Sequence, residues 1–201
     1  MKTTIYIIRH GEVFNPNKIL YGRLPHYKLS EKGIKEIEAS ASYLANKPIA
    51  AMYASPLLRA QQTAEIIQKK LHLPEIITTE QIIEINTSYE GKLFSDLDPI
   101  QSDVYLKPLR ETDETVEQIT ERMKQFFQSL IEKYPGKQVV VVSHGDPIMA
   151  LQATIKKLPM NFHSLRAEDG RTYVQHGEIL QIVAEDDNIS IASVFKPEVT
   201  L

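Results

Sequence analysis

The chain has 201 residues and a formal net charge of −3, with 23 lysines and arginines against 26 aspartates and glutamates. This balance offers no basic excess for nucleic acid, and the absence of cysteine excludes a disulfide framework, a thiol nucleophile and a thiolate zinc site. No apolar run approaches the roughly 20 residues of a membrane span, and the first residues lack the pattern of a secretion signal. We therefore expect one cytoplasmic domain over residues 1–201, with no nucleic-acid and no membrane partner.

Apolar runs alternate with amphipathic segments along the chain. The sequence predicts, in order, a strand at 4–8, a helix at 34–44 with Ser30 as N-cap, a strand at 49–54, a helix at 60–71, a strand over at least the ends of 76–85, a helix at 116–130, a strand at 138–142 and a helix at 148–155. The helices are predicted from apolar residues that recur every three or four positions. The run 138–142 is apolar without alternation, which is typical of a strand covered on both faces.

This alternation predicts an α/β fold with three layers, α/β/α, and a mainly parallel sheet. Residues 178–184 and 189–195 flank an acidic turn and predict a hairpin, which gives the sheet an antiparallel edge strand. Acids and prolines interrupt residues 89–113, which predict a long excursion or lid and not a domain boundary.

Charged or titratable residues lie at the end of each strand that we expect to be parallel. They are Arg9 and His10 after the first strand, Arg59 just beyond the second, Glu84 at the end of the third, and His144 after the fourth. The carboxyl ends of parallel strands border the ligand site in open α/β sheets. We therefore expect these side chains to converge at one edge of the sheet.

This set of side chains suits the chemistry of a phosphate monoester. Arginine binds a phosphate dianion bidentately, a neutral imidazole can attack phosphorus, and a second, protonated imidazole stabilises the equatorial oxygens. A carboxylic acid can protonate the leaving oxygen and then deprotonate the attacking water, while Gly11 and Gly145 would let the backbone approach the phosphate. His10, His144 and Glu84 could also ligate a metal ion, but two arginines would repel the ion, so we expect neither metal nor cofactor.

Three motifs in this order resemble those of the histidine phosphatase superfamily, which also holds the cofactor-dependent phosphoglycerate mutases. They are Arg9-His10-Gly11-Glu12, the stretch Ser55-Pro56-Leu57 followed by Arg59-Ala60 and Gln62-Thr63-Ala64, and Ser143-His144-Gly145. The resemblance spans positions 5 to about 150 and implies a phosphoglycerate mutase-like fold. It implies that His10 becomes phosphorylated, that Arg9, Arg59 and His144 clamp the phosphate, and that Glu84 is the proton donor.

The resemblance also marks positions around the substrate. Asn15 lies near the family's substrate-contacting asparagine, although its neighbours equally predict an Asx-turn. Tyr21-Gly22-Arg23 would line the pocket mouth, with Arg23 placed for a second anionic group. Glu80 and Glu90 stay open as alternative donors, because the segment before Glu90 is one residue shorter than is common.

Two further segments depart from the motifs or lie outside them. Asp113-Glu114-Thr115 stands where the family often has Gly-Glu-Ser, and Thr115 is a suitable N-cap for the helix that follows. The remaining histidines fall in no recognisable motif, and we expect them to be surface or structural residues: His26, His72, His163 and His176.

Three functions are compatible with these residues. The first is hydrolysis of a small phosphomonoester through a phosphohistidine; the alternatives are a phosphoglycerate mutase-type phosphoryl transfer and a non-catalytic regulatory module on the same fold. The chain is too compact for the insertions typical of the mutases, and all the clamp residues are present, so we expect a phosphatase. Its expected partner is the phosphomonoester substrate, and a homo-oligomer is compatible with this interpretation.

Overall fold

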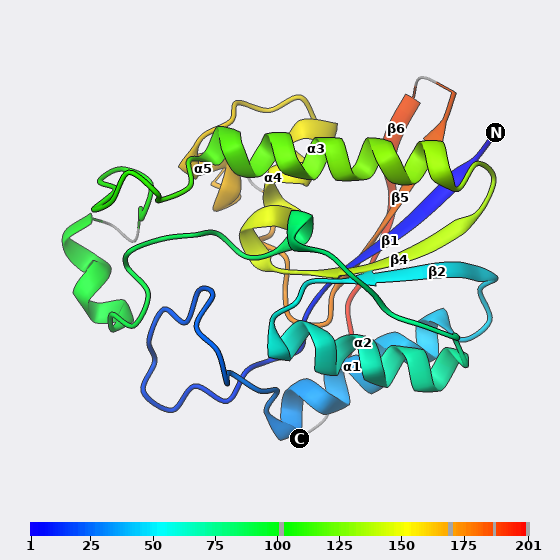
Figure 1. Ribbon diagram of the computed structural model, residues 1–201, viewed down its shortest axis with the longest axis horizontal. Helices are drawn as coiled ribbons and strands as arrows, with labels where there is room; N and C mark the ends of the chain where they lie inside the picture. Colours follow the sequence, from blue (N-terminus) through cyan, green and yellow to red (C-terminus); the bar gives the residue numbers. More distant parts are fainter. Residues whose placement is uncertain (101–102, 169–170, 187, 200–201) are drawn as a thin grey trace.

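The computed structural model describes residues 1–100, 103–168, 171–186 and 188–199, and its strands form one six-stranded sheet between layers of helices (Figure 1). The strands are β1 (Thr3–Arg9), β2 (Ile49–Ala54), β3 (Ile77–Thr78), β4 (Gln138–Ser143), β5 (Ile179–Glu185) and β6 (Asn188–Phe195). The α-helices are α1 (Glu31–Leu44), α2 (Leu58–Leu71), α3 (Val116–Lys133), α4 (Gly145–Ile155) and the short α5 (Phe162–Leu165). Two 3-10 helices, η1 (Glu80–Ile82) and η2 (Phe94–Ile100), lie between α2 and α3.

The sheet has the strand order β3-β2-β4-β1-β5-β6. Strands β3, β2, β4 and β1 are parallel, whereas β5 pairs antiparallel with β1 and β6 pairs antiparallel with β5. The predicted α/β class and mainly parallel sheet are confirmed, and the predicted hairpin supplies both strands of the antiparallel edge. Arg9 pairs with Ser143, so the chain leaves β1 and β4 at the same edge of the sheet.

Helices cover both faces of the sheet, with α1 and α2 on one side and α3 and α4 on the other (Figure 1). Strand β4 shows why its sequence does not alternate. Val139 and Val141 are buried in the cluster under α3 and α4, while Val140 and Val142 are buried in the cluster under α1 and α2. Each face of the strand is covered, so each position is apolar.

Two predicted helix starts are confirmed by their N-caps. The Ser30 hydroxyl accepts a hydrogen bond from the N–H of Gly33 at 3.0 Å, at the start of α1. At α3, the Thr115 hydroxyl accepts from the N–H of Gln118 at 3.3 Å, and the Gln118 side chain accepts from the N–H of Thr115 at 2.9 Å. This reciprocal capping box fixes the start of α3 beside Glu114.

Of the strand predicted over at least the ends of 76–85, only the first end forms. Only Ile77–Thr78 pairs with β2, and the chain then turns into η1. The Thr79 hydroxyl accepts a hydrogen bond from the N–H of Gln81 at 3.3 Å, which favours a helical turn over further extension. Ile82 and Ile85 are buried all the same, so apolar composition there reflects core packing and not a strand.

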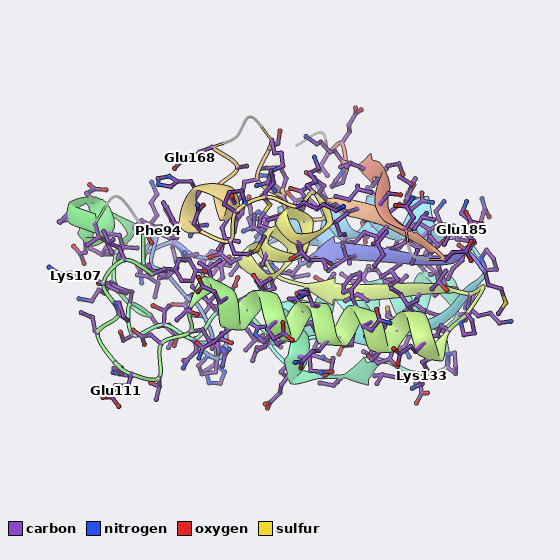
Figure 2. All side chains as sticks on the ribbon, turned by 90° about the horizontal axis from the view of Figure 1, so that it is seen from above. Phe94, Lys107, Glu111, Lys133, Glu168 and Glu185 are labelled. Carbon is purple, nitrogen blue, oxygen red and sulfur yellow. The ribbon has the colours of Figure 1, made fainter. Side chains whose placement is uncertain are left out.

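The predicted excursion at 89–113 lies beyond the carboxyl ends of the parallel strands, at the left of Figure 1, and contains η2. Figure 2 shows Phe94, Lys107 and Glu111 at one end of the molecule, and Lys133 and Glu185 toward the other. Leu97 and Val104 are buried in the core cluster under α3, so the excursion is anchored by packing. In the described part of the chain, no helix combines the length and apolar character that crossing a membrane requires.

Candidate active site

His10 and His144 follow β1 and β4, which are neighbouring parallel strands. Both side chains are buried, and their ring centroids lie 5.1 Å apart. The N–H of His10 donates to the carbonyl of Ser143 at 3.1 Å, which continues the sheet register by one residue. The sheet therefore brings these two predicted site residues together.

The hydrogen bonds of His10 define its tautomer. Nδ1 lies 2.8 Å from the carbonyl oxygen of Gly11, and Nε2 lies 3.1 Å from Nε of Arg59. A carbonyl can only accept and a guanidinium can only donate, so Nδ1 carries the proton and Nε2 presents a lone pair. Burial, together with the charges of Arg59 and His144, holds the pKa of His10 well below its ordinary value. His10 is thus a neutral imidazole with a nucleophilic Nε2.

Arg59 places a buried positive charge next to this nitrogen. Its side chain is 0% exposed, its Nη2 donates to the carbonyl of Gly22 at 2.7 Å, and its guanidinium lies 4.7 Å from the ring centroid of Tyr21. Burial lowers the pKa of Arg59, because the desolvated cation is costly. The donors of Arg59 point to neutral acceptors, so an anion bound here would compensate its charge directly.

Two more predicted clamp residues carry buried nitrogen atoms with no hydrogen-bond partner, namely Nε of Arg9 and Nδ1 of His144. Nη1 of Arg9 donates to the carbonyl of Val174 at 2.8 Å, and Nε2 of His144 lies 2.6 Å from Oγ of Ser55. Each side chain is therefore held by one nitrogen while another stays unpaired. Buried polar groups are nearly always paired, so these atoms point to a polar ligand in the site.

Glu84 lines a cavity of about 300 Å³ together with Arg9, Tyr21, Gly22 and others. Its Oε1 accepts a hydrogen bond from the N–H of Ile85 at 2.9 Å. Burial and the nearby carboxylate of Asp146 raise the pKa of Glu84, which favours the protonated form that a proton donor needs.

The two alternative donors have other positions. Glu80 is exposed in η1, and Glu90 accepts a hydrogen bond from the N–H of Arg23. Neither belongs to the described lining of the cavity, whereas Glu84 does. The geometry therefore favours Glu84 among the three acids.

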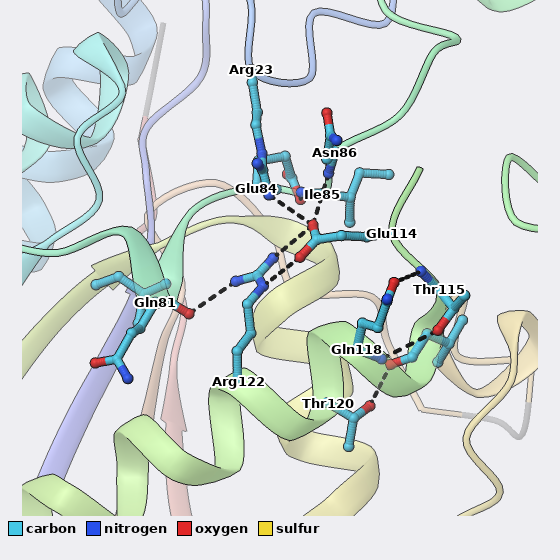
Figure 3. Close-up of polar contacts among 12 residues, drawn as sticks. Arg23, Gln81, Glu84, Ile85, Asn86, Glu114, Thr115, Gln118, Thr120 and Arg122 are labelled. Atoms are coloured by element: carbon cyan, nitrogen blue, oxygen red, sulfur yellow. Dashed lines mark hydrogen bonds and ion pairs between the residues drawn. The ribbon is translucent and has the colours of Figure 1, made fainter. Parts of the chain in front are cut away.

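The segment that carries Glu84 is braced by a cluster of ionic contacts around Glu114, which Figure 3 shows. Arg23 donates from Nη2 to Glu114 at 2.7 Å and from Nε to the carbonyl of Glu84 at 2.7 Å. Arg122 donates from Nε to Glu114 at 2.9 Å and from Nη1 to the carbonyl of Gln81 at 2.9 Å. The N–H of Asn86 also donates to Glu114, at 2.8 Å. The Glu114 carboxylate thus connects Gln81, Glu84 and Asn86, directly or through an arginine, to the start of α3. These contacts hold the segment in place of strand pairing, which ends at Thr78.

The predicted substrate roles of Arg23 and Asn15 are not matched by their positions. The guanidinium of Arg23 donates hydrogen bonds to the carbonyl of Glu84 and the carboxylate of Glu114, and Arg23 is not part of the described cavity lining. The Asn15 side chain donates to the carbonyl of Ile19 at 2.9 Å and accepts from its N–H at 3.2 Å, so it closes a local turn. The turn interpretation therefore describes Asn15, while Tyr21 and Gly22 do line the cavity.

Packing gives a reason for two of the predicted site glycines. At Gly11, an added Cβ would collide with the carbonyl oxygen of Gly33. At Gly145, it would collide with the hydroxyl of Tyr173. Close approach of protein atoms, in addition to any approach of a phosphate, therefore requires glycine at both positions.

The sequence predicts a surface or structural role for His176, but the structure places it beside His10. Their ring centroids lie 5.6 Å apart, and Nε2 of His176 is buried without a hydrogen-bond partner. Burial and the charge of Arg9 lower the pKa of His176 to about 3. The start of β5 pairs with the end of β1, and just before β5 the N–H of Gly177 donates to the carbonyls of Arg9 and His10, which brings His176 beside His10. That antiparallel register is the pattern that would have revealed His176.

Asp146, Tyr105, Arg166 and Tyr173 form a second group that the sequence did not reveal. Asp146 lies in the first turn of α4 and is 4% exposed. Its Oδ1 accepts from Arg166 at 2.9 Å and from Tyr173 at 2.7 Å, and its Oδ2 accepts from Tyr105 at 2.6 Å. Three of these residues, all except Tyr105, line the same cavity as Glu84.

Comparisons with known proteins agree with this geometry. The sequence model of the histidine phosphatase superfamily (branch 1) matches residues 5–179. A Mycobacterium tuberculosis protein, Rv0525, is 35% identical over 157 residues, which cover 75% of this chain and 77% of that protein. The phosphatase PhoE of Bacillus subtilis is 28% identical over 158 residues, which cover 76% of this chain and 77% of that protein.

Among solved structures, YhfR of Bacillus stearothermophilus superposes with a TM-score of 0.83 at 27% identity, covering 94% of this chain and 95% of that chain. The superfamily relatives include proteins named as phosphatases and as mutase-like proteins, and the fold is phosphoglycerate mutase-like. Sequence and fold therefore agree that this chain belongs to the histidine phosphatase superfamily.

Proposed function

We propose that this chain is a phosphatase that hydrolyses a small phosphomonoester through a phosphohistidine intermediate on His10. The observation that carries the proposal is the tautomer of His10: Nδ1 holds the proton, and the lone pair on Nε2 faces the buried guanidinium of Arg59. A neutral nucleophile beside an uncompensated cation is suited to attack on an anionic ester. The names of relatives such as the phosphatase PhoE support the same reaction class.

In the first step, the ester phosphate takes the place of His10 Nε2 as the acceptor of the Arg59 hydrogen bond. Nε2 then forms a bond to phosphorus, and the bond from phosphorus to the alcohol oxygen breaks. Glu84 gives its proton to that oxygen, so a neutral alcohol leaves. The positive charge on the phosphorylated imidazole is stabilised by the Nδ1–H bond to the carbonyl of Gly11.

In the second step, water attacks phosphorus and Glu84 accepts its proton. The new oxygen–phosphorus bond forms as the bond from phosphorus to Nε2 breaks, which releases inorganic phosphate and restores neutral His10 and protonated Glu84. The guanidiniums of Arg9 and Arg59 and the unpaired Nδ1 of His144 hold the equatorial oxygens through both steps. Burial and the nearby arginines hold the pKa of His144 well below its ordinary value, and the neutral ring donates from Nδ1 when Nε2 accepts from the Ser55 hydroxyl.

Replacement of His10 by alanine tests this proposal. His10→Ala is expected to lower kcat/KM for p-nitrophenyl phosphate by about a thousandfold or more, because the nucleophile is lost. His163→Ala is the matched control, since its side chain is 72% exposed, and it is expected to retain activity. Full activity of folded His10→Ala protein, or no hydrolysis of any phosphomonoester by the wild type, would contradict a phosphatase. Efficient isomerisation of 3-phosphoglycerate in the presence of its bisphosphate would point to a mutase instead.

A further inference from the structure

The lining of the cavity contains an ion pair between Arg166 and Asp146, whose side chains are 30% and 5% exposed. Arg166 donates from Nη1 and Nη2 to the two carboxylate oxygens of Asp146, at 2.9 and 3.4 Å. The guanidinium also lies over the rings of Phe162 and Tyr173, 5.2 and 5.4 Å from their centroids. The positive charge of Arg166 is therefore matched by a carboxylate within the protein, and the guanidinium lies close to two aromatic rings.

Asp146 is held in this pairing from three sides. Tyr173 and Tyr105 donate their hydroxyls to its two oxygens at 2.7 and 2.6 Å, in addition to the contacts from Arg166. The tyrosines come from segments far apart in the sequence, and both contacts are short. The arrangement keeps the carboxylate fixed against Arg166 and makes an exchange of partners costly.

The remaining lining of the cavity offers no second place for an anion. Among the described lining residues the cations are Arg9 and Arg166, and Arg9 belongs to the clamp. Arg23 lies nearby but directs its donors to Glu84 and Glu114. The other described lining residues include the acid Glu84 and the polar hydroxyls of Tyr21 and Tyr173, and the rest are apolar or glycine: Leu20, Gly22, Ile85, Phe94, Leu97 and Val104.

We propose that Asp146 is a specificity-determining residue, which neutralises Arg166 and so restricts the enzyme to phosphomonoesters whose alcohol half is uncharged. This inference rests on the proposed phosphatase function. A carboxylate or second phosphate on the substrate would lie beside Asp146 and an apolar wall, with no free cation to receive it. Such like-charge contacts and unpaired buried charges are costly.

A matched pair of substrates tests the wild-type enzyme. Glycerol 3-phosphate and 3-phosphoglycerate share a three-carbon skeleton and differ in a hydroxymethyl group against a carboxylate. The value of kcat/KM is expected to be at least ~10-fold higher for glycerol 3-phosphate, because only the carboxylate meets unfavourable charge. Equal or reversed values would overturn the role of Asp146 while leaving the phosphatase function intact. Absence of hydrolysis of both esters and of p-nitrophenyl phosphate would overturn the two proposals together.

Asp146→Asn tests the residue itself, since it removes the charge and keeps the size. Arg166 then has a free charge that can receive the carboxylate, so the substrate ratio is expected to fall by roughly tenfold. Both substrates have an alkyl alcohol as leaving group and need the same proton from Glu84. Any effect of the variant on Glu84 therefore cancels in the ratio of the two kcat/KM values. The double variant Asp146→Asn with Arg166→Met is expected to restore discrimination. An unchanged ratio in folded Asp146→Asn protein would overturn the proposal.

Arg166→Met alone gives an independent result if the asparagine variant does not fold. It leaves the Asp146 charge without its partner in the cavity wall, so discrimination against 3-phosphoglycerate is expected to increase. A decrease in discrimination would show that Arg166 binds the substrate carboxylate in the wild type, which contradicts the proposal.

Discussion

At the scale of single residues, the positions of protons on His10 and Glu84 determine what each group can do. The carbonyl of Gly11 holds the proton of His10 on Nδ1, and burial keeps the ring neutral. Glu84 lies in the same site but has the opposite shift, because burial and Asp146 both disfavour its charged form. The two environments separate a base that is ready to attack from an acid that is ready to donate.

These opposite shifts predict the pH profile of kcat/KM. The acid limb follows deprotonation of His10, whose lowered pKa moves this limb to below pH 6.5. The alkaline limb follows loss of the Glu84 proton, whose raised pKa moves this limb above pH 4.5. We expect a bell with an acidic to neutral optimum, measured with an alkyl phosphate. Glu84→Gln is expected to remove the alkaline limb, and a rate that stays flat into strongly basic solution would contradict Glu84 as the donor.

At the scale of elements, the site is built from strand ends on one side and from a braced loop on the other. Parallel pairing alone sets the positions of His10 and His144, and this could be predicted from the apolar runs before each motif. Glu84 has no such support, because β3 ends at Thr78. The contacts of Glu114 with Arg23, Arg122 and Asn86 replace the missing strand pairing.

This bracing predicts that Glu114 acts as a positioning residue for Glu84. Glu114→Gln removes the charge that pairs with Arg23 and Arg122, so Glu84 is positioned less precisely. The variant is expected to lower kcat/KM by about tenfold or more for an alkyl phosphate. The loss for p-nitrophenyl phosphate is expected to be smaller, since that leaving group needs little help from an acid. A general loss of folded protein would affect both substrates equally.

Glu117→Gln is the control for Glu114→Gln, because Glu117 is an exposed acid in the first turn of α3. It is expected to leave both substrates unaffected. Equal losses for the two esters in Glu114→Gln would contradict a role that acts through Glu84.

The same contrast explains which parts were predictable from the sequence. The periodic helices and the β-branched strand β4 are local patterns, and they lie close to their expected positions. The apolar residues after Thr78 resemble a strand, but a local N-cap at Thr79 overrides that pattern. His176 reaches the site only once β5 is paired with β1, which is a long-range contact. Asp146 directly follows the Ser143-His144-Gly145 motif, but its partners Arg166 and Tyr173 come from segments that no motif marks.

At the scale of the whole molecule, the net charge of −3 conceals the character of the site. Arg9, Arg59 and three histidines gather at one edge of the sheet. Of the acids nearby, Asp146 is paired with Arg166, and burial raises the pKa of Glu84. The sheet that carries this edge is held between two apolar clusters. Loss of packing in either cluster therefore affects the stability of the whole fold.

Phe126 tests the cluster under α3. It is 2% exposed, and its ring packs edge-on against Tyr53 of β2 with centroids 5.5 Å apart. Phe126→Ala is expected to lower the free energy of unfolding by about 3–5 kcal/mol, measured by denaturant titration. Leu106→Ala serves as the control, since Leu106 is 70% exposed, and it is expected to change stability by less than about 0.5 kcal/mol. Similar effects of the two substitutions would contradict the assignment of Phe126 to the core.

The covalent intermediate on His10 is the central claim, and trapping it is the most direct test. Glu84→Gln protein can still be phosphorylated by p-nitrophenyl phosphate, but it lacks the base that activates water, so the intermediate should accumulate. Rapid alkaline quenching followed by peptide mass spectrometry is predicted to find one phosphoryl group, on His10, that is lost in acid. Release of p-nitrophenol with no phosphoryl group on the protein, or with the group on another residue, would contradict the account.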